Sequence, residues 1–183
     1  EKIAEFIIRL IQKENIEINK KIEELNSHNQ ERGEAILVFL PGICTIEKVR
    51  KILRSRQVLD SLNAQIYVLH SSLTPNHQRR VFTPTKFGEW KIILSTNIAE
   101  TSVTIDEITH VIDCGMVREM RYDPITRISS LVTIECSKVS LIQRTGRAGR
   151  VKAGKCWRMF SKEWIDSNNL EEFPVPEIQR IPL

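Results

Sequence analysis

The segment from Gln143 to Arg150 reads Gln-Arg-Thr-Gly-Arg-Ala-Gly-Arg. Ser137 is a favoured N-cap residue and predicts the start of a helix. If that helix continues through the segment, Gln143, Arg147 and Arg150 share one face, while Arg144 points elsewhere. One amide and two guanidiniums would offer planar donors suited to phosphate oxygens. The glycines would let the backbone approach a neighbour or ligand. The alternative is a solvated basic helix.

A second polar segment runs from Ser95 to Asp106, directly after a predicted strand. Hydroxyl and amide side chains cluster there, where a connection through the core would favour small apolar residues. By itself this loop suggests contacts to phosphate or ribose.

The elements that must position these segments are apolar strands alternating with helices. We expect strands at 35–40, 65–69, 90–94, 108–114 and 155–160, and helices that open the chain, follow Gly42 and span Thr74 to Phe82. This alternation predicts an α/β fold with a parallel sheet covered by helices on both faces. Ligands in such sheets bind beyond the carboxyl ends of the strands. The loops of interest are therefore those at 40–42, 70–72, 95–97 and 115.

Two segments depart from the alternation. Residues 116–122 and 128–134 read as an antiparallel β-hairpin projecting from the core, either an edge hairpin or, through Arg118, Arg121 and Arg127, a guide for a polyanion. Residues 13–34 are polar and could form a solvated helix, a surface insertion or a linker.

Composition limits the possible functions. The net charge of +4 favours anionic partners only weakly. The four cysteines lack CxxC spacing, so we expect free thiols and no metal site. No apolar run predicts a membrane span.

Gly149 to Cys156 matches half of a P-loop, but no buried strand precedes it and a strand is predicted to follow, so we reject that motif.

Taken in order, these segments closely resemble the second RecA-like domain of the DEAH-box RNA helicases, a branch of superfamily 2. Leu37–Gly42 resembles motif IV, Leu69–Leu73 the region that follows it, Ser95–Asp106 motif V, and Gln143–Arg150 motif VI. The resemblance covers residue 35 to the end. It implies a RecA-like fold with a projecting hairpin.

The resemblance also implies roles for individual residues. Gln143 would approach the γ-phosphate and the attacking water, and Arg147 and Arg150 would be arginine fingers. Nucleotide contacts would come from Phe82, stacking on adenine unless it packs in the core, from Ser102, sensing the γ-phosphate, and from Thr104 and Asp106 at the ribose. Single-stranded RNA phosphates would be held by Ser71, Ser72, Thr96 and Asn97.

Three departures from the family pattern stand out. Leu141-Ile142 and Thr145 replace smaller residues beside motif VI, where we expect changes in packing only. Arg127 stands where a glycine usually closes the hairpin turn, which predicts a differently shaped tip.

We therefore expect residues 1–34 to be an opening helix with a polar insertion, and 35–173 to be the helicase C-terminal domain with its hairpin at about 116–134. Residues 174–183 would begin the connection to a winged-helix domain. The chain would be part of a longer intracellular protein, in nucleus or cytoplasm. A first RecA-like domain would hold most of the ATP and Mg²⁺, so this chain alone would be inactive.

The full-length protein would be an ATP-dependent RNA helicase, an RNA-stimulated NTPase that translocates on single-stranded RNA. Two alternatives stay open. One is a helicase-derived module that binds RNA or protein without productive hydrolysis, and the other is a DNA-directed translocase.

Overall fold

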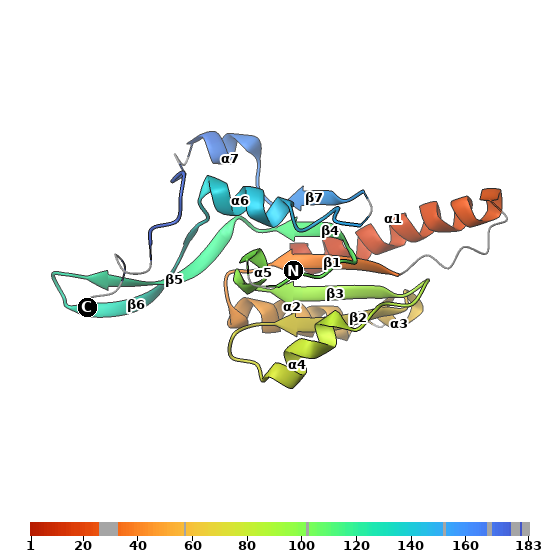
Figure 1. Ribbon diagram of the computed structural model, residues 1–183, viewed down its shortest axis with the longest axis horizontal. Helices are drawn as coiled ribbons and strands as arrows, with labels where there is room; N and C mark the ends of the chain where they lie inside the picture. The colour runs from red at the N-terminus through yellow and green to blue at the C-terminus, as the bar shows by residue number, and fades with distance from the viewer. Residues whose placement is uncertain are drawn as a thin grey trace.

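The computed structural model describes residues 1–25, 33–56, 58–101, 103–151, 153–167, 170–176 and 180. Its centre is a parallel sheet of five strands in the order β2-β3-β1-β4-β7. The strands are β1 (Glu34–Phe39), β2 (Ala64–Leu69), β3 (Trp90–Ser95), β4 (Ile108–Asp113) and β7 (Lys155–Arg158). Each lies within two residues of the strand expected from the sequence. The expected α/β architecture is confirmed (Figure 1).

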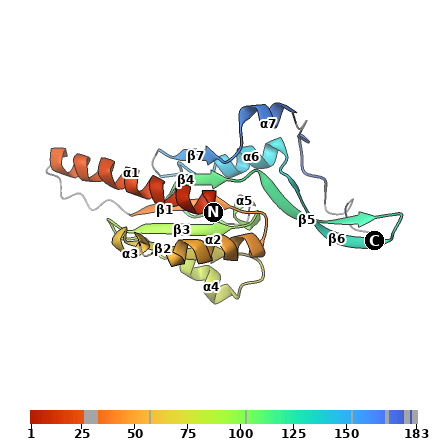
Figure 2. The same cartoon turned by 180° about the vertical axis from the view of Figure 1, so that it is seen from behind.

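The two faces of the sheet carry separate hydrophobic clusters, because consecutive strand residues point to opposite sides. Ile36 and Val38 of β1 pack on one face with α1 (Lys2–Leu25), α2 (Ile43–Ser55) and α3 (Val58–Ser61). Figure 2 shows α1 and α2 over this face. Leu37 and Phe39 point to the opposite face, toward Val81, Ala99 and Ile105. That face carries α4 (Pro75–Arg79), the 3-10 helix η1 (Arg80–Phe82) and α5 (Ile98–Thr101).

The opening helix α1 is longer than its apolar stripe alone indicated. Ile7 and Ile11 are fully buried against the sheet. Beyond them, Asn15 Oδ1 accepts a hydrogen bond from Trp90 Nε1 at 2.7 Å, and Glu14 pairs with Lys155 at 2.7 Å. Residues 13–25 are therefore helical, and for them the linker interpretation was wrong. The interpretation of 26–32 lies outside the described residues.

The predicted hairpin is formed by β5 (Met116–Asp123) and β6 (Ile128–Glu135), which pair antiparallel and extend away from the sheet (Figure 1). At its tip Arg127 has φ 56, a left-handed conformation that normally favours glycine. Asp123 holds the turn through the Ile125 amide at 2.9 Å and the Thr126 hydroxyl at 2.8 Å. The turn thus keeps the left-handed backbone in spite of the arginine.

The root of the hairpin packs with the last helices. Cys136, Leu141 and Leu170 form a third cluster, joined by residues of α7 (Lys162–Ser167). The backbone amides of Lys138 and Val139 donate to Glu171 and Glu172 carbonyls, so the segment 170–176 is fixed to α6 (Lys138–Thr145). The four cysteines are free thiols. Among the described residues, no helix combines the length and apolar character needed to cross a membrane.

Candidate functional site

The carboxyl ends of four strands lie abreast at one edge of the sheet. Ser95 at the end of β3 pairs with Leu69 of β2 and with Phe39 of β1, and Phe39 pairs with Asp113 of β4. The loops that follow these strands therefore meet at this edge, as the sequence predicted. We call it the strand edge, defined by residues 40–42, 70–72, 96–97 and 115. The hairpin leaves the sheet from the same edge (Figure 1).

Polar groups of the strand edge are partly preorganised. Ser71, Ser72 and Asn97 are exposed, whereas Thr96 is only 8% exposed. The Ser72 amide donates to His70 Nδ1 at 3.1 Å, and Ser72 Oγ lies 2.7 Å from the same nitrogen. Gln78 of α4 donates to the His70 and Leu73 carbonyls at 3.1 and 3.0 Å. His70 and Gln78 were not singled out in the sequence, although the loop that they fix was.

The helix α6 begins as predicted, with Ser137 Oγ accepting from the Ser140 amide at 3.2 Å. It ends at Thr145, however, so the condition under which Gln143, Arg147 and Arg150 would share one helical face is not met. Gly149 has φ 83, and its amide donates to the Ile108 carbonyl at 3.3 Å. A Cβ at Gly154 would lie 2.5 Å from the Gly149 nitrogen. The glycines serve a turn and a close backbone approach rather than a helical face.

Arg147 is held by the neighbouring loop. Its Nη1 donates to the Val103 carbonyl at 3.2 Å, and its Nε is buried without a hydrogen-bond partner. Burial lowers the pKa of Arg147, the positive charge of Arg150 lowers it further, and the negative charge of Glu100 partly opposes this shift. Within the described part of the chain, neither pairs with a carboxylate, so both can accept an anion. Gln143 is exposed on α6.

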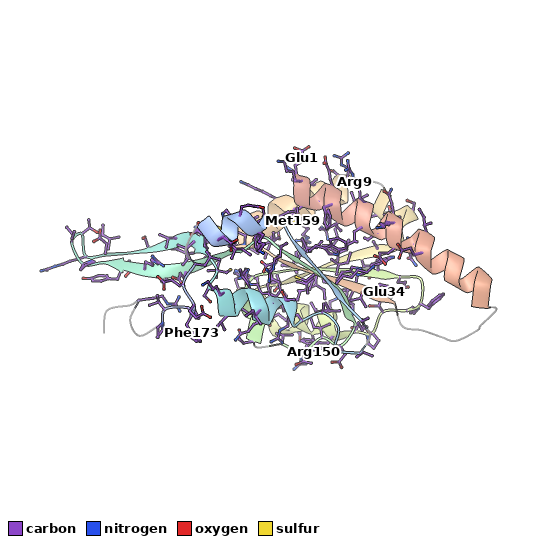
Figure 3. All side chains as sticks on the ribbon, turned by 90° about the horizontal axis from the view of Figure 1, so that it is seen from above. Glu1, Arg9, Glu34, Arg150, Met159 and Phe173 are labelled. Carbon is purple, nitrogen blue, oxygen red and sulfur yellow. The ribbon has the colours of Figure 1, made fainter. Side chains whose placement is uncertain are left out.

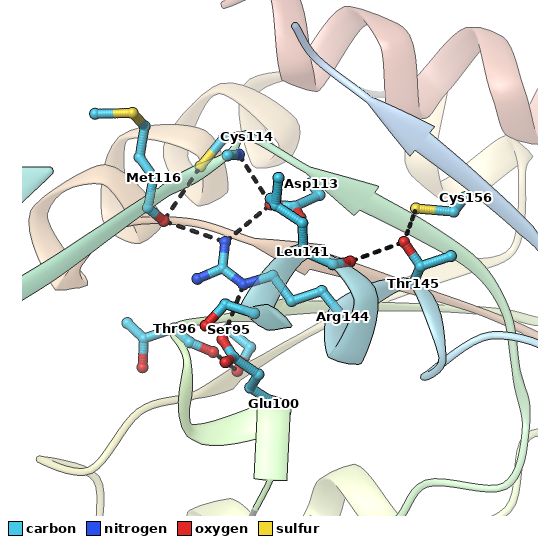
Figure 4. A network of polar contacts seen from close by, with 12 residues as sticks. Ser95, Thr96, Glu100, Asp113, Cys114, Met116, Leu141, Arg144, Thr145 and Cys156 are labelled. Atoms are coloured by element: carbon cyan, nitrogen blue, oxygen red, sulfur yellow. Dashed lines mark hydrogen bonds and ion pairs between the residues drawn. The ribbon is translucent and has the colours of Figure 1, made fainter. Parts of the chain in front are cut away.

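Arg144 points elsewhere, as expected, and is almost completely buried, with 1% exposure. Figure 4 shows its guanidinium between Glu100 and Asp113. Arg144 Nε lies 3.0 Å from Glu100 Oε2, and Nη1 lies 2.9 Å from Asp113 Oδ1 and 3.2 Å from the Met116 carbonyl. One side chain thus joins α5, the end of β4 and the start of the hairpin. These partners of Arg144 could not be predicted from the sequence.

Phe82 follows the buried Val81 at the end of η1 and is itself 47% exposed. Core packing, the alternative considered for Phe82, is therefore wrong. Thr104 and Asp106 are exposed in the loop that leads into β4. Ser102 lies outside the described residues. Val103 and Ala148 pack against the hydrophobic cluster on the face opposite α1, which includes Val81, the residue before Phe82. Figure 3 shows Arg150 on the side of the molecule away from Arg9 of α1.

A buried ion pair links the Phe82 segment to the loop carrying Thr104 and Asp106. Lys91 Nζ lies 2.9 Å from Glu107 Oε2 and also donates to the Val81 and Thr83 carbonyls. Glu107 accepts from the Thr85 amide at 3.0 Å and from its hydroxyl at 2.7 Å. Neither Lys91 nor Glu107 was singled out by the sequence. Lys91 lies inside an otherwise apolar strand, which was the available signal.

This pair predicts a loss of stability in acid. Burial raises the pKa of Glu107, but the hydrogen bonds from Lys91 and Thr85 outweigh it and lower the pKa below the ordinary 4.5. The stabilisation is therefore present above pH 4.5 and is lost as the pH falls through the lower pKa of the folded state. We expect Glu107→Gln to reduce this acid dependence in urea unfolding followed from pH 7 to acid. An unchanged pH profile would contradict the assignment.

A groove of about 630 Å³ lies beneath the hairpin, between β5, β6 and the segment 170–176. Asn97 of the strand edge lines it together with Arg118 and Arg121. Arg180 lies 2.8 Å from Glu119, and Arg121 lies 3.2 Å from the same residue. Arg118 therefore offers the freer positive charge at this end of the hairpin. Over the described residues, no cluster of three or more His, Cys, Asp or Glu side chains could hold a metal ion.

Comparisons with known proteins agree on one family. The family described as helicase conserved C-terminal domain matches residues 17–152. Human putative ATP-dependent RNA helicase DHX57 is 43% identical over 152 residues, with 81% of this chain and 11% of that protein covered. The ATP-dependent RNA helicase dhx29 of Xenopus laevis is 43% identical over 150 residues, with the same coverage. The chain thus spans about a tenth of the length of these relatives.

A solved structure supports the same fold. The crystal structure of the E. coli DExH-box NTPase HrpB superimposes with a TM-score of 0.70 at 35% identity, with 87% of this chain and 19% of that chain covered. The matched region contains the strand edge, Arg147 and Arg150. With its five-stranded parallel sheet and projecting hairpin, the chain belongs to the helicase conserved C-terminal domain family, as a second RecA-like domain of the DEAH-box type in superfamily 2.

Proposed function

We propose that this chain is the C-terminal RecA-like half of an ATP-dependent RNA helicase and completes an ATP site whose other half lies on a first RecA-like domain. The observation that carries the proposal is the set of contacts and charges around the Arg147 guanidinium. Its guanidinium is held by the Val103 carbonyl and is repelled by Arg150, without a carboxylate partner among the described residues. A triphosphate presented by another domain would supply the missing negative charge.

In this proposal Arg147 and Arg150 act as arginine fingers that neutralise charge developing during phosphoryl transfer. Gln143 approaches the γ-phosphate and orients the attacking water. Phe82 stacks on adenine, while Thr104 and Asp106 bind the ribose. Ser102 senses the γ-phosphate. The exposed ring of Phe82 and the exposed positions of Thr104 and Asp106 support these contacts.

In our proposal the first RecA-like domain would supply most of the protein ligands of Mg²⁺, and the ion would help to neutralise the charge of the ATP phosphates. Apart from the carboxylate of Asp106, which in our proposal accepts from the ribose hydroxyls, the groups at this site are guanidinium, amide and hydroxyl groups that suit phosphate oxygens.

Single-stranded RNA binds at the strand edge through Ser71, Ser72, Thr96 and Asn97. These groups would contact the phosphate backbone, so binding ignores base sequence and weakens with salt. Three of the four side chains are exposed at one edge of the sheet, which supports this placement. Closing and reopening of the two RecA-like domains during each ATP cycle would then move the RNA.

We expect this chain alone to show no measurable ATPase, because it would hold only half of the site. The full-length protein should hydrolyse ATP, and RNA should stimulate the rate more than DNA. Turnover by the isolated chain in a steady-state phosphate-release assay would contradict the half-site proposal. Absence of stimulation in the full-length protein would favour a binding module, and equal stimulation by DNA would favour a DNA-directed translocase.

A further inference from the structure

The outer face of α2 carries a concentration of positive charge that the proposed site does not use. From Ile43 to Arg56 there are five basic residues and one acidic residue, a surplus of four positive charges. The whole chain has a net charge of +4. The surplus on this helix together with its C-cap residue Arg56 thus equals the positive surplus of the entire protein.

Most of this charge is not neutralised locally. Glu47 is occupied by Arg50, whose Nη1 lies 3.0 and 3.3 Å from its two carboxylate oxygens. Arg56 lies 3.9 Å from Glu5. Lys48, Lys51 and Arg54 are exposed, and no described residue forms an ion pair with them. We call these three residues the α2 basic face.

The geometry of the α2 basic face suits a chain of phosphates. Lys48, Lys51 and Arg54 recur every three residues, so they follow one side of the helix over about 9 Å. Their side chains line an open groove of about 440 Å³, together with Cys44, Glu47 and Arg50. Ile46, Val49 and Leu53 fix the opposite side of the helix in the core. The helix cannot rotate these charges away without exposing that core.

The α2 basic face also begins close to the strand edge. Helix α2 follows directly from Gly42, one of the strand-edge residues. A Cβ at Gly42 would lie 3.2 Å from Arg118 Cδ, so the arginine at the hairpin root lies against the start of this helix. Positive charge therefore extends from the hairpin root along the outer side of α2, which covers the same sheet face as α1 (Figure 2).

We propose that the α2 basic face binds the phosphate backbone of RNA beyond the stretch held at the strand edge, as a second, sequence-independent contact. Exposed lysines and an arginine without acidic partners favour a polyanion over an apolar partner. The proposal rests on the proposed RNA function but assigns RNA to a surface outside motifs IV, V and VI.

The test compares Lys48→Gln/Lys51→Gln/Arg54→Gln with a matched control that removes three exposed charges elsewhere, Lys13→Gln/Lys86→Gln/Lys162→Gln. Both variants of the full 183-residue chain are titrated with fluorescent oligouridylates of about six and about twenty nucleotides. We expect the α2 variant to bind the longer RNA at least about tenfold more weakly, and its slope of log K against log salt to decrease by about 2. The α2 variant should bind the shorter RNA with unchanged affinity. The control variant should bind both RNAs with unchanged affinity.

Cys44 provides an independent readout. It is exposed on this face, whereas Cys136 is buried and Cys114 and Cys156 are partly buried, so a thiol-reactive photocrosslinker should label Cys44 preferentially. We expect crosslinks to the longer RNA only, and none in Cys44→Ser. The proposal would be overturned if the α2 and control variants bound the longer RNA with equal affinity. It would also be overturned if the α2 substitutions weakened binding of the shorter and the longer RNA equally. Binding of polyglutamate instead of RNA would assign the face to an acidic protein.

These outcomes separate the inference from the proposed function. If RNA stimulates the ATPase of the full-length protein but the α2 variant binds the longer RNA normally, only the second contact is wrong. If RNA neither binds nor stimulates, the proposed function itself fails.

Discussion

Replacing Arg147 with alanine in the full-length protein should abolish RNA-stimulated ATP hydrolysis while leaving RNA binding largely intact. An arginine finger contributes roughly 10³ to 10⁵ in rate, which corresponds to about 4 to 7 kcal/mol of the activation barrier. Arg147 Nη1 donates to the Val103 carbonyl, which is not one of the strand-edge residues where the proposed RNA contacts lie. Loss of the guanidinium should therefore affect the chemical step and not RNA affinity.

The measurement is single-turnover ATP hydrolysis at saturating RNA, with RNA affinity measured in parallel. Arg147→Lys serves as the conservative variant, since a lysine keeps the charge but lacks the planar pair of donors. Arg9→Ala, on α1 and away from Arg150 (Figure 3), controls for loss of a surface charge. Near-normal turnover in Arg147→Ala would refute the finger role.

Arg144→Ala should destabilise the domain by about 3 to 5 kcal/mol, because it leaves two buried carboxylates without their shared cation. Glu100 is 8% exposed and Asp113 is fully buried. Burial disfavours the charge on Arg144, but Asp113 and Glu100 hold its pKa above the ordinary value. The guanidinium also lies 4.9 Å from the centre of the Phe39 ring, so the substitution removes packing as well.

Urea unfolding of this chain measures the loss. Arg50→Ala is the matched control, since it breaks an exposed arginine–glutamate pair on a helix and should cost about 0.5 kcal/mol or less. Arg144→Lys should recover only part of the stability, because one ammonium cannot reproduce both the Glu100 and the Asp113 contacts. Equal stabilities of Arg144→Ala and the Arg50→Ala control would contradict the structural role.

The strands and most helices could be predicted because their signals are local. A continuous apolar run marked β1, and Ser137 marked the start of α6 through its own side chain. The hairpin was recognisable from two strands around a turn. The carboxyl-end rule for parallel sheets then placed the strand edge without knowledge of side-chain contacts.

The parts that could not be predicted depend on contacts between distant residues. Trp90 binds Asn15 across 75 positions, and Arg144 reaches Glu100 across 44. The spacing of apolar residues within one segment cannot predict partners that lie so far apart in the sequence. The end of α6 could not be predicted, because the turn at Gly149 combines a left-handed conformation with a hydrogen bond to the carbonyl of Ile108, a residue of β4 far away in the sequence. Arg147 and Arg150 consequently lie beyond the end of α6 rather than on one helical face.

The central claim is that Arg147 and Arg150 act on a triphosphate held by another domain. The most direct test is a structure of the full-length protein with RNA, ADP and an aluminium fluoride that mimics the transferred phosphoryl group. The account predicts guanidinium nitrogens of both arginines within about 3 Å of the fluoride or phosphate oxygens, with Phe82 against the adenine. A closed complex in which both arginines face solvent, away from the nucleotide, would contradict it.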